Sequence, residues 1–164
     1  MLRPLKGRAA RGSGTRFAIV ASQYNSRYVD SMVKAAQLEL KRGGAGHIRV
    51  VRVPGAFEIP AVASTLAAQS KKTPADQAFD ALICFGVIFQ GQTSHAQHIG
   101  WGVTHALAQI QVQQGIPVIH AVFVFGKEEH ARVRCLGKKH NRGTEAARTA
   151  LSMATVMKSL RKFR

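Results

Sequence analysis

Asp80–Ile88 reads DALICFGVI, a nearly continuous apolar run, and it is the strongest indication of the fold class. A strand with one face in water alternates apolar and polar residues, whereas a strand covered by helices on both faces is apolar along its length. The run therefore predicts a central strand of a parallel sheet. The flanking segments are expected to supply further strands and the covering helices.

A strand and a helix are predicted near the start of the chain. Residues 16–22 (RFAIVAS) are a short apolar segment. The side-chain oxygen of Asn25 or Ser26 is expected to cap the following helix, and Gly43–Gly44 to end it. The helix itself is predicted over 26–42, from the helical spacing of Val29, Val33, Ala36 and Leu40.

The same alternation continues through the middle of the chain. His47–Val53 is a valine-rich strand, Pro54–Gly55 breaks it, and a helix is predicted from about Ile59 to Gln69. After the central apolar run, the turn FQGQTS precedes another helix, with an apolar stripe formed by Ile99, Val103, Ala106, Leu107 and Ile110.

The last third of the chain completes the pattern. Pro117–Val124 is predicted as a strand, followed by a basic segment with a short helix at Lys127–Arg134. A final helix is predicted from about Gly143, with a stripe of Ala147, Ala150, Leu151, Ala154 and Met157. The whole alternation implies a three-layer α/β/α sandwich around a mainly parallel, four-stranded sheet of the flavodoxin-like kind.

One domain is expected over residues 16–158, with a flexible basic arm at 1–15 and a basic tail at 159–164. Ligands in such folds bind beyond the carboxyl ends of the strands. The places to search are therefore the loops after Ser22, Val53, Ile88 and Val124.

The composition excludes several classes of protein. No segment approaches the roughly 20 apolar residues of a membrane span, and no secretory signal begins the chain, so a cytoplasmic protein is expected. Cys84 and Cys135 belong to no CxxC pair and are expected to be free thiols. The motifs GxGxxG, GxxxxGK[ST] and GxSxG are absent.

The formal net charge of +16 favours anionic partners. A shell that binds nucleic acid or other polyanions is one alternative, although few aromatic residues interleave with the basic ones. For the two tails, a solvated basic surface is the favoured explanation. The basic residues of the third cluster need another explanation; they are Arg132, Arg134, Lys138, Lys139 and Arg142.

Gly91–Ser94 (GQTS) precedes a predicted helix, whose free N–H groups make a plausible phosphate seat or an ordinary helix cap. His95 follows and is suited to proton transfer near neutral pH. A metal site at His95, His98 and His105 is disfavoured, since no acid or cysteine completes it. In the turn PGAFEIP, Phe57 and Glu58 are placed either to hold a ligand or, for Glu58, to stabilise a helix N-terminus.

Three motifs together resemble one family. They are VPGAFEIP at 53–60, GVIFQGQTSH at 86–95 and GIPVI at 115–119, and they are similar to those of the lumazine synthases. The resemblance covers about residues 16–157 in the family's order. It implies condensation of 5-amino-6-(D-ribitylamino)uracil with 3,4-dihydroxy-2-butanone 4-phosphate to 6,7-dimethyl-8-ribityllumazine, with loss of phosphate and water and without cofactor or metal.

The resemblance also implies roles for individual residues. His95 matches the general acid/base, and Tyr24 the aromatic residue that stacks on the pyrimidine. The remaining positions match substrate-binding residues. Ala56, Phe57 and Glu58 border the uracil and ribityl chain; Val87, Ile88 and Phe89 meet the pyrimidine through their backbone; Gln92, Thr93 and Arg134 hold phosphate; Lys138, Arg142 and Glu145 lie nearby, with Glu145 placed to orient His95.

The family's sites lie between adjacent subunits of a pentamer, so the His120 strand end and the Arg134 loop are expected to come from a neighbour. Pentamer, decamer and icosahedral shell all remain open, and riboflavin synthase is an expected partner. His120 stands where the family has Phe, and a histidine ring can still stack on a pyrimidine. An inactive paralogue is the alternative that this replacement suggests. Ala96 and Gln90 also depart from the family pattern.

Overall fold

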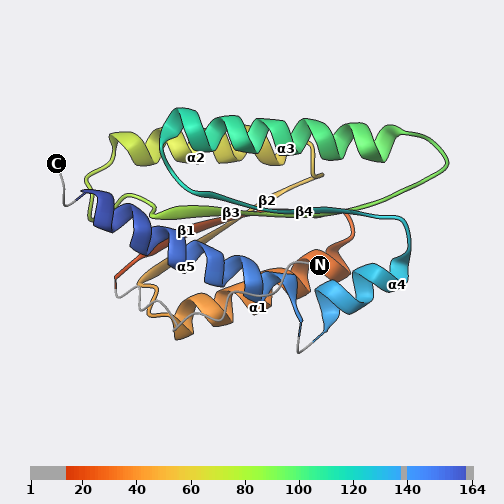
Figure 1. Ribbon diagram of the computed structural model, residues 1–164, viewed down its shortest axis with the longest axis horizontal. Coiled ribbons are helices and arrows are strands. Elements are labelled where there is room, and N and C mark those ends of the chain that lie inside the picture. Colours follow the sequence, from red (N-terminus) through yellow and green to blue (C-terminus); the bar gives the residue numbers. More distant parts are fainter. Residues whose placement is uncertain (1–13, 138–139, 162–164) are drawn as a thin grey trace.

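The computed structural model describes residues 14–137 and 140–161 as three layers, with a sheet between two layers of helices (Figure 1). Residues 1–13 of the predicted arm and 162–164 of the predicted tail lie outside the described residues, and α5 continues past the predicted boundary at 158. The elements are β1 Arg16–Ser22, α1 Ser26–Arg42, β2 His47–Val53, α2 Ile59–Lys72, β3 Ala81–Phe89, α3 His95–Gln114, β4 Val118–Phe125, α4 Glu128–Ala131, η1 Arg132–Leu136 and α5 Arg142–Arg161.

The four strands are parallel, in the order β2-β1-β3-β4. This is the flavodoxin-like order with four strands in place of five. Every residue from Ala81 to Val87 of β3 is buried, which confirms the central strand predicted from the apolar run. The order of connections reverses between β1 and β3, and ligands of such sheets bind at the carboxyl ends beside this point.

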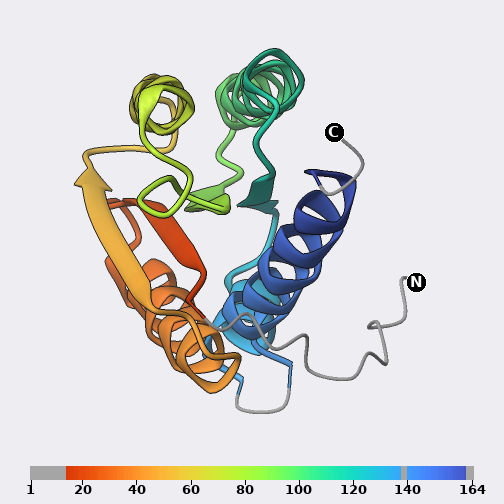
Figure 2. The ribbon, with the colours of Figure 1, turned by 90° about the vertical axis from the view of Figure 1, so that its left-hand side faces the viewer.

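Alternate residues of the central strands face two separate cores. Phe17 and Ile19 of β1 and Phe85 of β3 are fully buried against α1 and α5. Val20 of β1 and Leu82 of β3 are equally buried on the other face, against α2 and α3. Figure 2 shows the two helix layers on opposite sides of the sheet, which confirms the predicted three-layer sandwich.

Most boundaries agree with the sequence prediction within one to three residues. The basic segment after β4 is the exception. A short helix was predicted over 127–134, but α4 covers Glu128–Ala131 only and Arg132–Leu136 then form the π-helical turn η1. A π-helical turn has a wider hydrogen-bond spacing than an α-helix and is a frequent feature of functional sites.

The cap predicted for α1 is also different. Asn25 precedes the helix with φ 56°, and its side chain makes no capping hydrogen bond. Its amide Nδ2 instead donates to the carbonyl of Val87 at 2.8 Å, across to the end of β3. The other end agrees with the prediction, because α1 stops at Arg42 and Gly43 N–H bonds to the Glu39 carbonyl.

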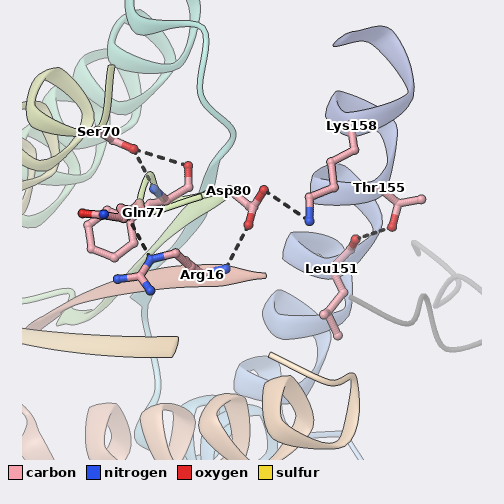
Figure 3. Close-up of polar contacts among 8 residues, drawn as sticks. Arg16, Ser70, Gln77, Asp80, Leu151, Thr155 and Lys158 are labelled. Atoms are coloured by element: carbon pink, nitrogen blue, oxygen red, sulfur yellow. Dashed lines mark hydrogen bonds and ion pairs between the residues drawn. The ribbon is translucent and has the colours of Figure 1, made fainter. Parts of the chain in front are cut away.

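Polar contacts close the sheet at the amino ends of its strands (Figure 3). Asp80 accepts a hydrogen bond from the Arg16 backbone N–H at 2.9 Å and lies 3.8 Å from the Lys158 ammonium of α5. The Arg16 side chain also donates to the Gln77 carbonyl. The loops expected to bind ligands lie at the opposite end of the strands.

The structure also bears on the predictions made from composition for the two cysteines and for membrane spans. Cys84 and Cys135 are both buried free thiols, as predicted. Burial raises the pKa of the Cys84 thiol to about 12 and that of Cys135 to about 11. Among the described residues, no helix combines the length and apolar character needed to cross a membrane.

Candidate active site

The loops that follow β1 and β2 are joined by backbone hydrogen bonds. Gln23 N–H donates to the Val53 carbonyl at 2.8 Å, and Tyr24 N–H to the Pro54 carbonyl at 3.1 Å. Glu58 closes the second loop, since its Oε2 accepts from Gly55 N–H at 2.9 Å. These contacts fix the two loops as one unit beside the switch point of the sheet.

Two aromatic rings are exposed on this unit. Tyr24 is 70% and Phe57 60% exposed. The Tyr24 ring packs over Gly55, where an added Cβ would lie 3.1 Å from Tyr24 Cδ2. Phe57 lies beside α3, because a Cβ on Gly102 would meet its ring at 3.6 Å. Exposed rings on rigid loops offer flat apolar faces to a ligand.

The side chains at the end of β3 pack into the two cores of the sandwich. Val87 is buried in the core under α1 and α5, and Phe89 packs edge-on against Tyr28 with ring centroids 5.6 Å apart. Ile88 packs into the opposite core, toward α2 and α3. Ala56 is buried next to β3, near the position that a Cβ on Gly86 would take. These side chains are therefore committed to packing.

The turn before α3 is organised by its own polar groups. Gln90 Nε2 donates to the Thr93 carbonyl at 2.8 Å, and the Thr93 hydroxyl oxygen lies 3.4 Å from His95 N–H. Gln92, Thr93 and His95 are exposed at the start of this 20-residue helix. Its first N–H groups and positive dipole end suit an anion such as phosphate.

His98 and His105 of α3 contact different side chains. His98 Nε2 lies 3.1 Å from the Ser94 hydroxyl, and the His105 ring stacks on Trp101 with centroids 6.1 Å apart. Within residues 14–137 and 140–161, no group of three His, Cys, Asp or Glu side chains is arranged to hold a metal ion.

His120 lies on β4 and contacts α3 through Thr104. Its Nε2 is 2.9 Å from the Thr104 hydroxyl oxygen, and that hydroxyl donates its one proton to the Gly100 carbonyl at 2.7 Å. The Nε2–H tautomer of His120 would donate to the Thr104 hydroxyl while that hydroxyl donates to Gly100. Partial burial lowers the pKa of His120 below its ordinary value, so the neutral ring is favoured.

The basic residues after β4 form a second group. Arg134 is exposed on η1, and within the described residues its guanidinium has no hydrogen bond or ion pair. Arg142 pairs with Glu145 and lies 5.9 Å from the centre of the Phe123 ring. Glu145 is thus held by Arg142 within the same chain. Lys138 lies outside the described residues.

The two groups lie at the same end of the molecule but on opposite faces of the sheet. Figure 1 shows the start of α3 above the sheet and α4 below it, both at the end where the strands stop. No hydrogen bond or ion pair between described residues joins His95 or Glu58 to Arg134. One chain therefore presents two separate surfaces, one aromatic with a helix N-terminus and one basic.

Sequence reasoning did not identify the residues that support these loops. The Tyr28 hydroxyl donates to Glu128, and this hydrogen bond and burial raise the pKa of Tyr28. Ser31 and Asn141 both donate to the Cys135 carbonyl. Asn141 could have been recognised as the cap of α5, because it precedes a helix that begins RGTE. The partners of Tyr28 and Ser31 are about a hundred residues away, and no local signal indicates them.

The structure belongs to the class of flavodoxin-like α/β sandwiches, in which ligands bind at the carboxyl ends of the strands beside the switch point. The family model of 6,7-dimethyl-8-ribityllumazine synthase matches residues 14–158. The chain belongs to this family.

Relatives that carry the name of this family come from several organisms. The 6,7-dimethyl-8-ribityllumazine synthase of Pyrococcus furiosus is 33% identical over 150 residues, which are 92% of this chain and 90% of the relative. Those of Xanthomonas oryzae pv. oryzae and Stenotrophomonas maltophilia are each 35% identical over 147 residues, 88% of this chain and 91% and 90% of the relatives. The family predicted from the three sequence motifs is confirmed.

Proposed function

We propose that this chain is the subunit of an enzyme that makes 6,7-dimethyl-8-ribityllumazine in riboflavin biosynthesis. Its substrates would be 5-amino-6-(D-ribitylamino)uracil and 3,4-dihydroxy-2-butanone 4-phosphate, and its other products phosphate and water. The observation that carries the proposal is the position of two exposed aromatic rings, Tyr24 and Phe57, on linked loops at the carboxyl ends of β1 and β2, with Phe57 against α3 at Gly102. A flat pyrimidine can stack on aromatic faces of this kind.

The first group of residues suits the pyrimidine substrate. The Tyr24 and Phe57 faces can stack against its ring. Glu58 uses one carboxylate oxygen to hold Gly55 N–H, and its other oxygen is free to accept from ribityl hydroxyls. The backbone at the end of β3 can pair with the polar edge of the uracil. Together these contacts would hold the attacking amine in one orientation.

The α3 N-terminus suits the second substrate. Its N–H groups and the Thr93 hydroxyl favour the phosphate, and His95 follows in the first turn of the helix. The amine attacks the ketone, and water leaves as an imine forms. A proton then leaves the neighbouring carbon as phosphate departs, and the ribityl-bearing nitrogen closes the second ring with loss of water. His95 is proposed to move the protons of these steps.

We further propose that the second group, with His120, Arg134, Lys138, Arg142 and Glu145, completes the site of an adjacent subunit. The sheet separates Arg134, Arg142 and Glu145 from the first group, which supports this arrangement, and among the described residues the Arg134 guanidinium has no hydrogen bond or ion pair. His120 instead faces α3, and its exposed position on the edge strand β4 leaves it open to a neighbouring subunit. A guanidinium can grip the phosphate in bidentate fashion and stabilise it as it leaves. A closed ring of subunits, such as a pentamer, would give every site both groups.

Turnover is tested by following lumazine absorbance with both substrates, against the uncatalysed reaction. Wild type should exceed background, His95→Ala and Arg134→Ala should lose most of the rate, and Thr155→Ala, on the far part of α5, should retain it (Figure 3). No acceleration by folded wild-type oligomer would refute the proposed function.

The shared site is tested by mixing the two inactive variants and reassembling them. If each site takes His95 from one subunit and Arg134 from the next, random mixing restores about a quarter of the sites. If both residues act within one chain, the mixture remains as inactive as its components.

A further inference from the structure

Arg134 lies on a segment that is too short to be a stable helix without contacts from the rest of the fold. The turn η1 has five residues, and the preceding α4 has four. Isolated helices of this length are unstable in water, and π-helical turns are weaker still. The direction of the exposed Arg134 guanidinium must therefore be set by contacts from elsewhere in the fold.

The contact that holds the start of this segment comes from α1. The Tyr28 hydroxyl donates a hydrogen bond to Glu128, the first residue of α4. The Tyr28 ring is only 4% exposed and packs edge-on against Phe89, so the hydroxyl is presented from a fixed position. Arg27 also approaches Glu128, at 4.0 Å, but an exposed ion pair of this length contributes little.

The end of the segment is held from the same helix. Ser31 Oγ donates to the Cys135 carbonyl at 2.7 Å, and Asn141 Nδ2 donates to the same oxygen at 2.6 Å. Asn141 Oδ1 in turn accepts from Gly143 N–H at 2.8 Å, which ties this point to the first turn of α5. Cys135 is fully buried, so its carbonyl is a firm anchor one residue after Arg134.

Tyr28 and Ser31 are three residues apart and therefore lie on the same face of α1. One helix face thus holds both ends of the segment that carries Arg134. The side chains that do so come from the first two turns of α1, about a hundred residues earlier in the chain. Figure 1 shows α1 and α4 on the same side of the sheet.

We propose that Tyr28 and Ser31 are positioning residues that act through Arg134. They fix η1 so that the guanidinium meets the substrate phosphate without first having to be ordered. This inference rests on the proposed role of Arg134 in phosphate binding. A bidentate grip needs both N–H groups in one geometry, and ordering a mobile arginine at the moment of binding lowers affinity.

The experiment measures binding of inorganic phosphate by calorimetry and the KM of each substrate for the assembled protein. Tyr28→Phe removes only a hydroxyl and keeps the ring against Phe89. Ser31→Ala removes the other bond. Thr155→Ala is the matched control, because it removes one hydroxyl hydrogen bond at the far part of α5. Glu128→Gln keeps an acceptor for Tyr28, whereas Glu128→Ala does not.

The double variant Tyr28→Phe with Ser31→Ala should weaken phosphate binding about tenfold and raise the KM of the phosphate substrate similarly. The KM of the pyrimidine should stay within about twofold, a split that general destabilisation would not produce. Glu128→Gln should resemble wild type and Glu128→Ala should resemble Tyr28→Phe. In an Arg134→Ala background the double variant should cause no further loss, because the residues act only through Arg134.

Two results would overturn the positioning role. The first is unchanged phosphate affinity in the double variant while Arg134→Ala weakens it, which would leave the proposed function intact. The second is a further loss of affinity when the double variant is added to Arg134→Ala. If wild type shows no turnover, the proposed function fails by itself. Arg134-dependent phosphate binding that needs Tyr28 and Ser31 would still support the positioning role, and its absence would refute it.

Discussion

Replacing Gly143 by alanine should destabilise the protein, although alanine is the better helix former. Gly143 is buried in the first turn of α5, facing α1. A Cβ there would lie 2.0 Å from the carbonyl oxygen of Met32 and 2.6 Å from its carbonyl carbon. These are backbone atoms, which cannot rotate away, so α5 and α1 would have to separate.

The magnitude follows from two opposing terms. Alanine gains about 1 kcal/mol over glycine in a helix. Overpacking costs about 1–3 kcal/mol, and a clash with backbone belongs at the upper end of that range. The net loss should be about 2 kcal/mol, which lowers Tm by about 4–8 °C for a chain of this size. Gly143 N–H also donates to Asn141 Oδ1, and Asn141 helps to hold the Arg134 segment. The substitution should therefore also lower the affinity for phosphate.

The assay is thermal and urea unfolding at one fixed protein concentration, since the proposed assembly would make Tm depend on concentration. Gly126→Ala is the control, because an added Cβ there meets nothing within 4 Å. Gly43→Ala is the contrasting case, since its nearest atoms belong to the Leu151 side chain, 2.4 Å away, and Leu151→Val should partly relieve it. A Gly143→Ala protein as stable as wild type would refute the close approach of the two helices.

Three other variants or measurements test separate features. Cys84, whose pKa burial raises to about 12, should resist alkylation at pH 8 until the protein unfolds, as followed by mass spectrometry. His120 has its pKa lowered in the fold, so its contribution to stability is complete above the ordinary value of 6.5 and is lost as pH falls through the lowered pKa. Denaturation against pH should show this slope in wild type and a shallower one in His120→Phe. Asn25→Gly keeps the positive φ but removes the bond to Val87, so it should raise the KM of the pyrimidine and leave phosphate binding unchanged.

The strands and long helices could be predicted from sequence because burial imposes a period on each of them. The apolar run of β3 and the spacing of Val29, Val33 and Leu40 on α1 each report a face in the core. The segment after β4 could not be predicted in the same way. Its π-helical turn depends on hydrogen bonds from Ser31 and Asn141 to the Cys135 carbonyl. Such contacts produce no regular spacing of residues that could be recognised in the sequence.

The candidate site also contains residues whose positions the sequence could predict and residues whose contacts it could not. Tyr24, Phe57, Glu58 and His95 follow strand ends that the sequence predicts, so the topology alone brings their loops to one edge. The capping role predicted for the Asn25 side chain was wrong, because its amide is held by donation from Nδ2 to a tertiary partner, the Val87 carbonyl, and its Oδ1 makes no capping hydrogen bond. Local rules assign a polar side chain to its nearest free backbone group, and they fail where a distant group is better placed.

Helix α1 is the element that connects these observations. Asn25, directly before its first turn, ties it to β3, and Tyr28 and Ser31 in its first two turns hold the Arg134 segment. In a ring of subunits, the Tyr24 loop would serve one site and the Arg134 segment the next. The start of α1 would then support both proposed sites through separate hydrogen bonds, so that removing one bond should affect one substrate and leave the other unchanged.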